Sequence, residues 1–124
     1  MGARIEGIGA YVPSRRVSNK ELPELLDTSD EWIRSHTGIG YRHIANDDEA
    51  ASDLAGEAAR VALERSDTDP DSIDMILVAT ASADYVGFPS TACIVQNLIG
   101  AKNAAAMDIG AGCTGFVYGL ETAK

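Results

Sequence analysis

The hydrophobic and polar positions along the chain predict an alternation of strands and helices in its second half. Residues 74–80 (DMILVAT) and 103–109 (NAAAMDI) are apolar runs of strand length. A continuous apolar run is typical of a parallel strand that is covered on both faces. Between them, residues 89–100 (PSTACIVQNLIG) place Pro89 at a plausible first helical position and end at a glycine. This pattern predicts a βαβ unit with a parallel sheet and helices on its faces.

The first half of the chain contains weaker signals. Residues 3–10 predict a strand. Ser18, followed three positions later by glutamate, fits a capping box and predicts a short helix, which Pro23 limits. Thr28 opens a second capping box and a helix that a glycine ends. The polar stretch over residues 40–52 is predicted to be a loop.

The remaining pattern completes the alternation. Ser52 is predicted to cap a helix over residues 53–66, and a turn follows before the strand at 74–80. A last helix is expected to begin at Cys113, and its pattern continues to Lys124 without a glycine or proline that would end it. A domain that ends within a helix is expected to be a fragment.

Composition narrows the function classes. The 124 residues are the size of one domain, and 19 acidic against 10 basic residues give a net charge of −9. That balance argues against nucleic-acid binding, because phosphate neutralisation needs clustered Lys and Arg. No apolar run reaches the roughly 20 residues of a membrane helix, and the N-terminus lacks a signal-peptide pattern. We expect a cytoplasmic protein with no membrane and no nucleic-acid partner.

The two cysteines differ in their surroundings. Their spacing is not that of metal ligands, so no metal site is predicted. Cys93 lies within an apolar segment and fits a small buried hydrophobic residue. Cys113 follows a predicted strand and opens a predicted helix, where backbone N–H groups favour the nucleophilic thiolate. Gly112 and Gly115 leave space beside the sulfur, so a packing role and a catalytic role are both open for Cys113 at this point.

Several blocks of the chain resemble a known family. The stretch GAGCTGF after AAMDI resembles the active-site cysteine motif of thiolase-fold condensing enzymes. The blocks DTSDEWIRSHTGI, RHIA, ILVATASADY and FPSTAC resemble β-ketoacyl-acyl-carrier-protein synthase III in particular, in the expected order from GIGAYVP onward. The resemblance implies an α/β, thiolase-like fold with a parallel-rich sheet flanked by helices. Residues 1–124 would then be the N-terminal portion of a thiolase-like domain whose C-terminal half is absent.

The resemblance also implies a reaction. The Cys113 thiolate would take the acyl group of an acyl-CoA primer, usually acetyl-CoA, and pass it to the carbanion formed when malonyl-acyl-carrier protein loses CO₂. This decarboxylative condensation initiates fatty-acid synthesis and needs no cofactor beyond the acyl-CoA substrate. The family supplies a catalytic His and Asn from its C-terminal half, so residues 1–124 alone are expected to be inactive. The expected partners are that C-terminal half and a second copy in a homodimer.

Further site residues follow from the resemblance. Trp32 matches a tryptophan that stacks on the adenine of CoA, and Thr28 matches a residue near the CoA entrance. His36 stands where the family generally has arginine, which puts a phosphate or carrier-protein contact in doubt, although Arg34 lies nearby. Phe88 matches a residue that reaches across the dimer interface into the partner's acyl pocket. For Trp32 and Phe88, ordinary roles in a helix core and a loop are the alternatives.

Two other readings stay open at the level of the whole chain. One is a related thiolase-fold acyltransferase of secondary metabolism. The other is a non-catalytic fragment or pseudo-enzyme that only binds a partner. Neither His36 nor His43 follows a strand of the βαβ half, so neither is predicted to be the base for Cys113.

Overall fold

The structure is a computed structural model that describes residues 3–22 and 26–124. The chain forms two compact units, which we call the large unit (Met1–Tyr11 and Ala50–Lys124) and the small unit (Val12–Glu49). Each unit is built from its own elements and is described by itself. The assignment of the chain to one thiolase-like domain stays a prediction.

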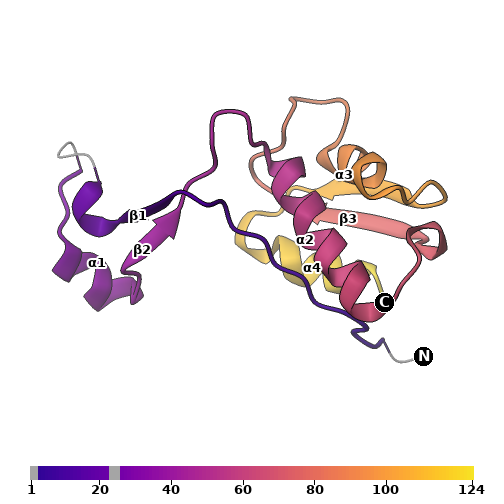
Figure 1. Ribbon diagram of the computed structural model, residues 1–124, viewed down its shortest axis with the longest axis horizontal. Helices are drawn as coiled ribbons and strands as arrows, with labels where there is room; N and C mark the ends of the chain where they lie inside the picture. Colours follow the sequence, from indigo (N-terminus) through magenta and orange to yellow (C-terminus); the bar gives the residue numbers. More distant parts are fainter. Residues whose placement is uncertain (1–2, 23–25) are drawn as a thin grey trace. The chain divides into compact units, whose positions relative to one another are not determined.

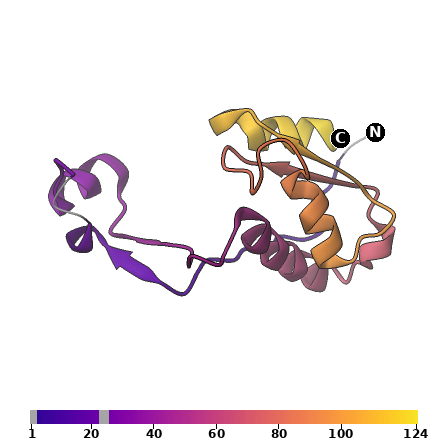
Figure 2. The same cartoon turned by 90° about the horizontal axis from the view of Figure 1, so that it is seen from above.

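A βαβ motif forms the centre of the large unit. Its helices and strands are α2 (Ala51–Ser66), β3 (Met75–Ala79), α3 (Thr91–Ile99), β4 (Ala105–Ile109) and α4 (Gly115–Thr122). The two strands are parallel and pair from Met75↔Ala105 to Ala79↔Ile109. Figures 1 and 2 show α2 and α3 on one face of this sheet and α4 on the other. The predicted βαβ arrangement is confirmed.

The core of the large unit lies where α3 meets the sheet. Ala92 and Val95 on α3, with Ala101 and Ala104 before β4, are buried. The strands themselves are only partly covered, because residues such as Met75 are exposed among the described residues. The predicted cover by helices is thus present on both faces, but it is incomplete in this chain as described.

Helix starts in the large unit differ from the predicted ones. Pro89 was predicted to be the first helical residue, but α3 begins at Thr91 and Ser90 caps it, because the Ser90 hydroxyl accepts a hydrogen bond from the N–H of Cys93. The backbone N–H of Ala50 donates to the Asp53 carboxylate at the start of α2. Ser52, the predicted cap of this helix, is instead buried within its first turn.

The N-terminal segment is not the strand that was predicted. Residues 3–10 have no regular secondary structure, and no described strand pairs with them. Instead the backbone lies directly against α2: a side chain at Gly9 would overlap the carbonyl oxygen of Ala58. The guanidinium of Arg65 on α2 also donates to the Ile8 carbonyl at 2.9 Å. Packing on a helix thus replaces strand pairing as the partner of this segment.

The small unit is held by a short antiparallel pair and one helix. Its elements are β1 (Arg16–Ser18), a 3₁₀ turn η1 (Asn19–Glu21), α1 (Asp30–Thr37) and β2 (Tyr41–His43). Strand β2 lies in the stretch predicted to be a loop, and it forms because β1 supplies its backbone partners from Arg16↔His43 to Ser18↔Tyr41. A strand of three residues is too short to give a recognisable alternation of apolar and polar positions, so the sequence did not indicate β2.

The two capping predictions of the small unit have different outcomes. The Glu21 carboxylate accepts from the N–H and hydroxyl of Ser18, as predicted, but a single 3₁₀ turn follows instead of a helix. Leu22 is extended, the conformation that a following proline favours; the rest of that predicted helix reaches residues 23–25, outside the described residues. For α1, Ser29 rather than Thr28 is the cap, and the helix ends at Gly38 as predicted.

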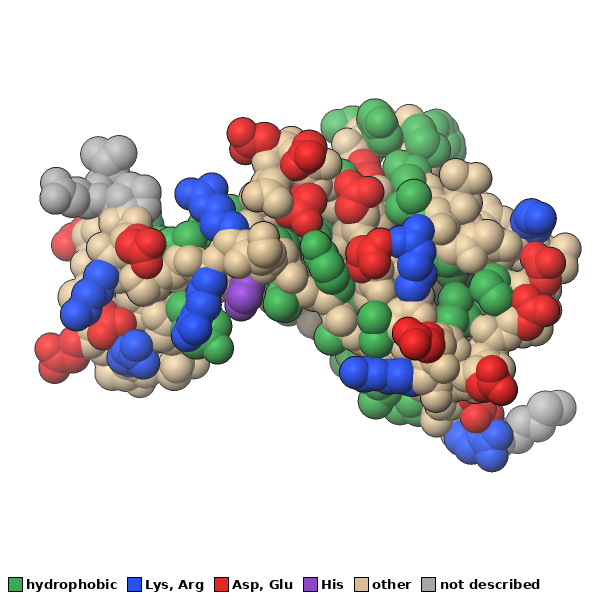
Figure 3. Space-filling view, in the orientation of Figure 1, with side chains coloured by type: hydrophobic (Ala, Val, Ile, Leu, Met, Phe, Trp, Pro, Cys, Tyr) green, Lys and Arg blue, Asp and Glu red, His purple; other side chains and the backbone are tan. Residues whose placement is uncertain are grey.

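Charge is dispersed over one face of the molecule. On the face drawn in Figure 3, Lys and Arg side chains stand among acidic ones instead of forming a continuous basic patch. In the part of the chain that the structure describes, no helix is both long enough and apolar enough to cross a membrane.

Candidate active site

Cys113 lies in a tight turn directly after the end of β4. The turn is a 3₁₀ segment, η3 (Gly112–Thr114), and α4 begins immediately behind it at Gly115. The predicted α-helix therefore opens two residues later than Cys113. Gly112 has a φ of 52°, in the left-handed region that favours glycine. The turn leaves the Cys113 side chain exposed.

The backbone N–H of Cys113 is available to a ligand. The next two N–H groups are occupied within the turn: Thr114 donates to the Ala111 carbonyl at 3.2 Å, and Gly115 donates to Gly112. Among the described residues, no acceptor takes the N–H of Cys113. A free N–H beside a thiol is a donor that can stabilise an oxyanion formed on the carbonyl that the thiol attacks.

The start of α4 is seated on the carboxyl ends of both strands. A methyl group at Gly115 would lie 3.1 Å from Cβ of Ala79 on β3 and 3.6 Å from the carbonyl oxygen of Ile109 on β4. One turn later, Gly119 faces Ile109 at 3.7 Å. Gly115 thus packs closely on both strand ends and fixes the turn that carries Cys113, whereas Gly119 makes an ordinary contact with the Ile109 side chain.

Asp108 on β4 is a functional-site residue that the sequence analysis missed. Its carboxylate accepts hydrogen bonds from the N–H groups of Thr91 (2.8 Å) and Ala92 (2.7 Å), the first two residues of α3. This ties the start of α3 to the strand that leads into Cys113. An acidic residue inside the apolar run AAMDI is the signal that could have found it, because a carboxylate in such a run needs partners.

A second aspartate holds the segment that precedes α3. Asp84 accepts from the N–H of Ser52 at 3.0 Å, and its own N–H donates to the Thr91 hydroxyl at 3.3 Å. Phe88 lies in this segment and is 92% exposed. Such exposure leaves its aromatic ring without a core role in the described chain.

Cys93 requires a correction. It was predicted to be a small buried hydrophobic residue, yet its side chain is exposed. It occupies the face of α3 that turns away from the core, whereas Ala92 and Val95 supply the buried face. The apolar neighbours in sequence thus lie on other sides of the helix.

The CoA-binding candidates on α1 separate into two faces. Trp32 and His36, four residues apart, stack with ring centroids 4.3 Å apart and ring planes 21° apart. Arg34 lies on the opposite side of the helix, where its guanidinium donates to the Asp30 carboxylate at 2.9 Å. The same guanidinium packs against Gly40, where a side chain would overlap it. Thr28 is exposed just before the helix. The structure therefore brings Trp32 and His36 together and keeps Arg34 away from them.

Hydrogen bonds lower the pKa of two carboxyl groups in the small unit. The amide of Asn19 donates to Asp30 and, with Arg34, holds the pKa of Asp30 below its ordinary value. The hydrogen bonds from Ser18 lower the pKa of Glu21 in the same way. Both histidines, His36 and His43, also belong to this unit.

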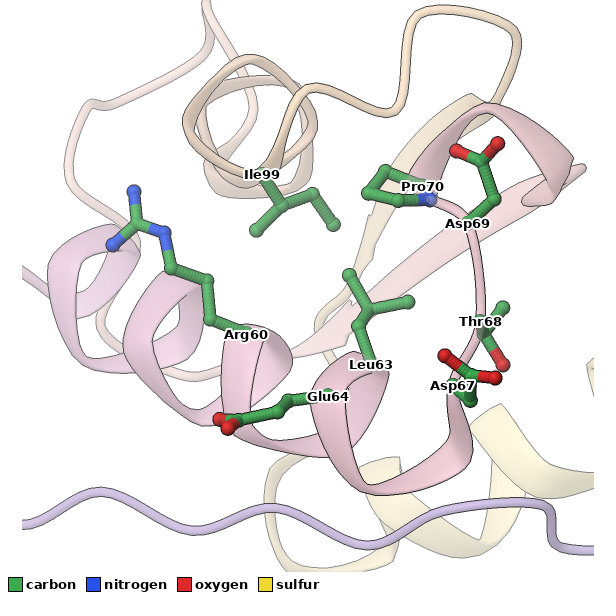
Figure 4. Close-up of a pocket in the computed structure, with 8 residues that line it drawn as sticks. All are labelled: Arg60, Leu63, Glu64, Asp67, Thr68, Asp69, Pro70 and Ile99. Atoms are coloured by element: carbon green, nitrogen blue, oxygen red, sulfur yellow. The ribbon is translucent and has the colours of Figure 1, made fainter.

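The large unit has a surface hollow away from these candidates. It has a volume of about 660 Å³ and lies between the end of α2, the turn at Pro70 and the end of α3. Figure 4 shows Arg60, Glu64 and Asp67 along one side of it and Ile99 and Pro70 opposite, with Leu63 in the space between. None of the predicted site residues lines this hollow. In the described ranges, no group of three or more His, Cys, Asp or Glu residues could hold a metal ion.

Comparison with known proteins gives one consistent result. A β-ketoacyl-[acyl-carrier-protein] synthase III of Sulfurovum sp. is 50% identical over 122 residues, and that of Syntrophomonas wolfei is 52% identical over 124. The match covers 98% and 100% of this chain but 36% and 37% of those proteins. In sequence and fold, the chain matches the β-ketoacyl-acyl-carrier-protein synthase III family. No family profile matches the chain.

Solved structures extend this match to the fold. A 3-oxoacyl-[acyl-carrier-protein] synthase III from Aquifex aeolicus superposes with a TM-score of 0.90 at 43% identity, covering 98% of this chain and 39% of that one. The priming β-ketosynthase of the R1128 polyketide pathway superposes at 0.88 with 39% identity, covering 97% and 36%. The thiolase-like α/β fold class is confirmed. The chain spans less than two fifths of the length of these synthase III relatives.

Proposed function

We propose that the protein containing this chain is a β-ketoacyl-acyl-carrier-protein synthase III, an acyltransferase that condenses an acyl-CoA primer with malonyl-acyl-carrier protein. The observation that carries the proposal is the exposed Cys113 in a glycine-bounded turn, with a free backbone N–H, at the carboxyl ends of two parallel strands. The family match supports the same reaction.

The first step uses the geometry of the Cys113 turn. The thiolate attacks the thioester carbonyl of the primer, the N–H of Cys113 donates to the oxyanion, and the bond to the CoA sulfur breaks. CoA leaves as a thiolate and takes up a proton. The product is an acyl thioester on Cys113.

The second step returns the thiol. Malonyl-acyl-carrier protein loses CO₂, and the electron pair of the broken C–C bond attacks the acyl carbonyl on Cys113. The bond to the Cys113 sulfur then breaks, which gives a β-ketoacyl-acyl-carrier protein and the free thiolate. Acetyl-CoA is the proposed primer, and fatty-acid initiation is the proposed role.

The binding roles on α1 and before α3 are part of the same proposal. Trp32, Thr28 and His36 form the CoA-binding site on this unit, and Arg34 contributes its charge from the opposite face of α1. Phe88 contributes to the acyl pocket of a partner copy in a homodimer; its high exposure supports a role in contact with another surface. Two free thiols support a cytoplasmic location, where cysteines stay reduced, and no cofactor beyond the acyl-CoA substrate is required.

We also propose that residues 1–124 alone are inactive in condensation. The decarboxylation step needs donors that stabilise an enolate. The large unit, which carries Cys113, contains no histidine. Apolar side chains on α4, such as Phe116 and Val117, are exposed and support a further covering surface, which we assign to the C-terminal half of the same enzyme.

The proposal is tested by a condensation assay on the full-length protein. Acetyl-CoA and malonyl-acyl-carrier protein should give acetoacetyl-acyl-carrier protein, Cys113→Ala should give none, and residues 1–124 alone should give none. Product from residues 1–124 would overturn the division of labour between the two halves.

A second candidate function has support from one comparison. The similarity to a priming β-ketosynthase of a polyketide pathway favours an acyltransferase of secondary metabolism that uses the same cysteine. A primer series separates the two: preference for acetyl-CoA supports fatty-acid initiation, and preference for a longer or branched primer supports the polyketide-type role. If the full-length protein forms no acyl thioester, the result supports the alternative of a pseudo-enzyme that only binds a partner.

A further inference from the structure

The stack of His36 on Trp32 gives one face of the indole a fixed neighbour. The two rings are nearly parallel, with planes 21° apart and centroids separated by 4.3 Å, which is within stacking contact. Trp32 nevertheless stays 54% exposed. Among the described residues, His36 is the only ring that stacks on it. The imidazole therefore covers one indole face, and about half of the Trp32 surface remains accessible to a ligand.

Backbone contacts fix the covering ring as well. Nδ1 of His36 lies 2.8 Å from the carbonyl oxygen of Trp32 and 3.0 Å from the hydroxyl of Ser35. The Ser35 hydroxyl donates to the same Trp32 carbonyl at 2.9 Å. Because Nδ1 is held inward, the imidazole cannot rotate away from the indole without losing these contacts. An arginine at this position would have no ring to hold in this way.

The face is also free of competing ion pairs. Arg34, the nearest permanent cation along α1, is engaged with Asp30 on the other side of the helix. The exposed Trp32–His36 pair is thus an apolar and aromatic surface, suited to a flat heteroaromatic group and not to a phosphate alone.

We propose that His36 is a positioning residue, which holds Trp32 so that its other face stacks on the nucleobase of the CoA substrate. This inference rests on the proposed function, since it assigns a role to a residue of the same binding site. The base, the indole and the imidazole would form three consecutive layers. Affinity for the base then depends on a residue that does not itself touch it.

The test compares ligands with and without a base, on the full-length protein. His36→Ala should weaken CoA binding about three- to tenfold, the range of a lost aromatic pair, and leave the Michaelis constant for acetyl-pantetheine, which lacks the nucleotide, unchanged. His36→Phe keeps a ring over Trp32 and should bind CoA within about twofold of the wild type. His43→Ala is the matched control, because His43 contacts Tyr41 edge-on and not Trp32.

A spectroscopic readout reports the positioning directly. Trp32 is the only tryptophan of residues 1–124, so replacing any further tryptophan of the full-length protein by phenylalanine leaves a fluorescence signal that reports on Trp32 alone. His36→Ala should make it more accessible to acrylamide quenching in the free protein, and His36→Phe and His43→Ala should not. Equal quenching in wild type and His36→Ala, or equal weakening of CoA and acetyl-pantetheine, would overturn the positioning role. A wild type that binds no CoA would instead overturn the proposed function, and this inference with it.

Discussion

The two units of the chain are stabilised by different means. In the large unit, small residues let backbone segments touch: Gly9 lies on α2, and Gly115 lies on the ends of β3 and β4. In the small unit, a buried asparagine, Asn19, connects the elements through polar side chains. The position of the cysteine turn therefore depends on close packing at glycines, whereas the position of α1, which carries Trp32, depends on side-chain hydrogen bonds.

The hydrogen bonds of Asn19 reach three parts of the small unit. Its Nδ2 donates to the Asp30 carboxylate and to the Ile39 carbonyl, both at 2.8 Å, and its Oδ1 accepts from Arg42 at 2.7 Å. The other terminal nitrogen of Arg42, Nη1, is buried without a partner among the described residues. Loss of the Asn19 side chain would therefore remove a hydrogen bond from three partner groups at once.

The largest effect is expected from Asn19→Leu. A leucine of similar volume removes three hydrogen bonds, two of them to charged groups, and should lower the free energy of unfolding by about 3 kcal/mol. Urea unfolding followed by Trp32 fluorescence measures it, because Trp32, the only tryptophan of residues 1–124, lies in the small unit; any tryptophan beyond these residues is replaced by phenylalanine. Lys20→Ala, at an exposed neighbour, is the control. A loss no greater than that of the control would contradict a polar basis for this unit.

Gly9→Ala should have a smaller effect, confined to the large unit. The added methyl would overlap the Ala58 carbonyl and lie 2.5 Å from the Ala62 nitrogen, so the N-terminal segment must move from α2 at a cost of about 1–3 kcal/mol. Gly110→Ala is the matched control, since no atom lies within 4 Å of its added methyl. Hydrogen exchange of α2 peptides should rise in the first variant only; equal exchange in both would argue against close packing.

Acid should affect the small unit by the smallest amount. The folded-state pKa values of Asp30 and Glu21 lie below their ordinary ones, so their contribution to stability is complete above those ordinary values and is lost as the pH falls through the folded values. Asp30→Asn should reduce this acid dependence of Trp32 fluorescence, and Glu31→Gln, an exposed neighbour on α1, should not. An acid response that is unchanged in Asp30→Asn would contradict the role of Asn19 and Arg34 in holding that carboxylate.

The features that follow from local pattern were predictable. The strands at 75–79 and 105–109, the helices between and before them, and the glycine ends of α1 and α3 were all indicated by apolar runs and caps. Cys113 was also indicated, because glycines and a strand end surround it in the sequence itself.

The features that depend on distant partners were not predictable. Asn19 and Asp108 form hydrogen bonds with residues 11 to 23 positions away, so a local pattern does not show which groups they hold. The segment at residues 3–10 was predicted to be a strand from its composition, but strand formation needs a neighbour, and α2 is the surface it contacts instead. Cys93 is exposed because the helical phase, not the apolar neighbours in sequence, decides which face is buried.

The acylation of Cys113 is the most direct test of the account, and Cys93 provides an internal control because both thiols are exposed. The full-length protein is incubated with acetyl-CoA alone, and its peptides are analysed by mass spectrometry. We predict an acetyl thioester on Cys113, its loss on treatment with hydroxylamine, no acetyl group in Cys113→Ala, and normal acetylation in Cys93→Ala. Acetyl on Cys93, or undiminished acetylation in Cys113→Ala, would contradict the claim that the turn after β4 presents the nucleophile.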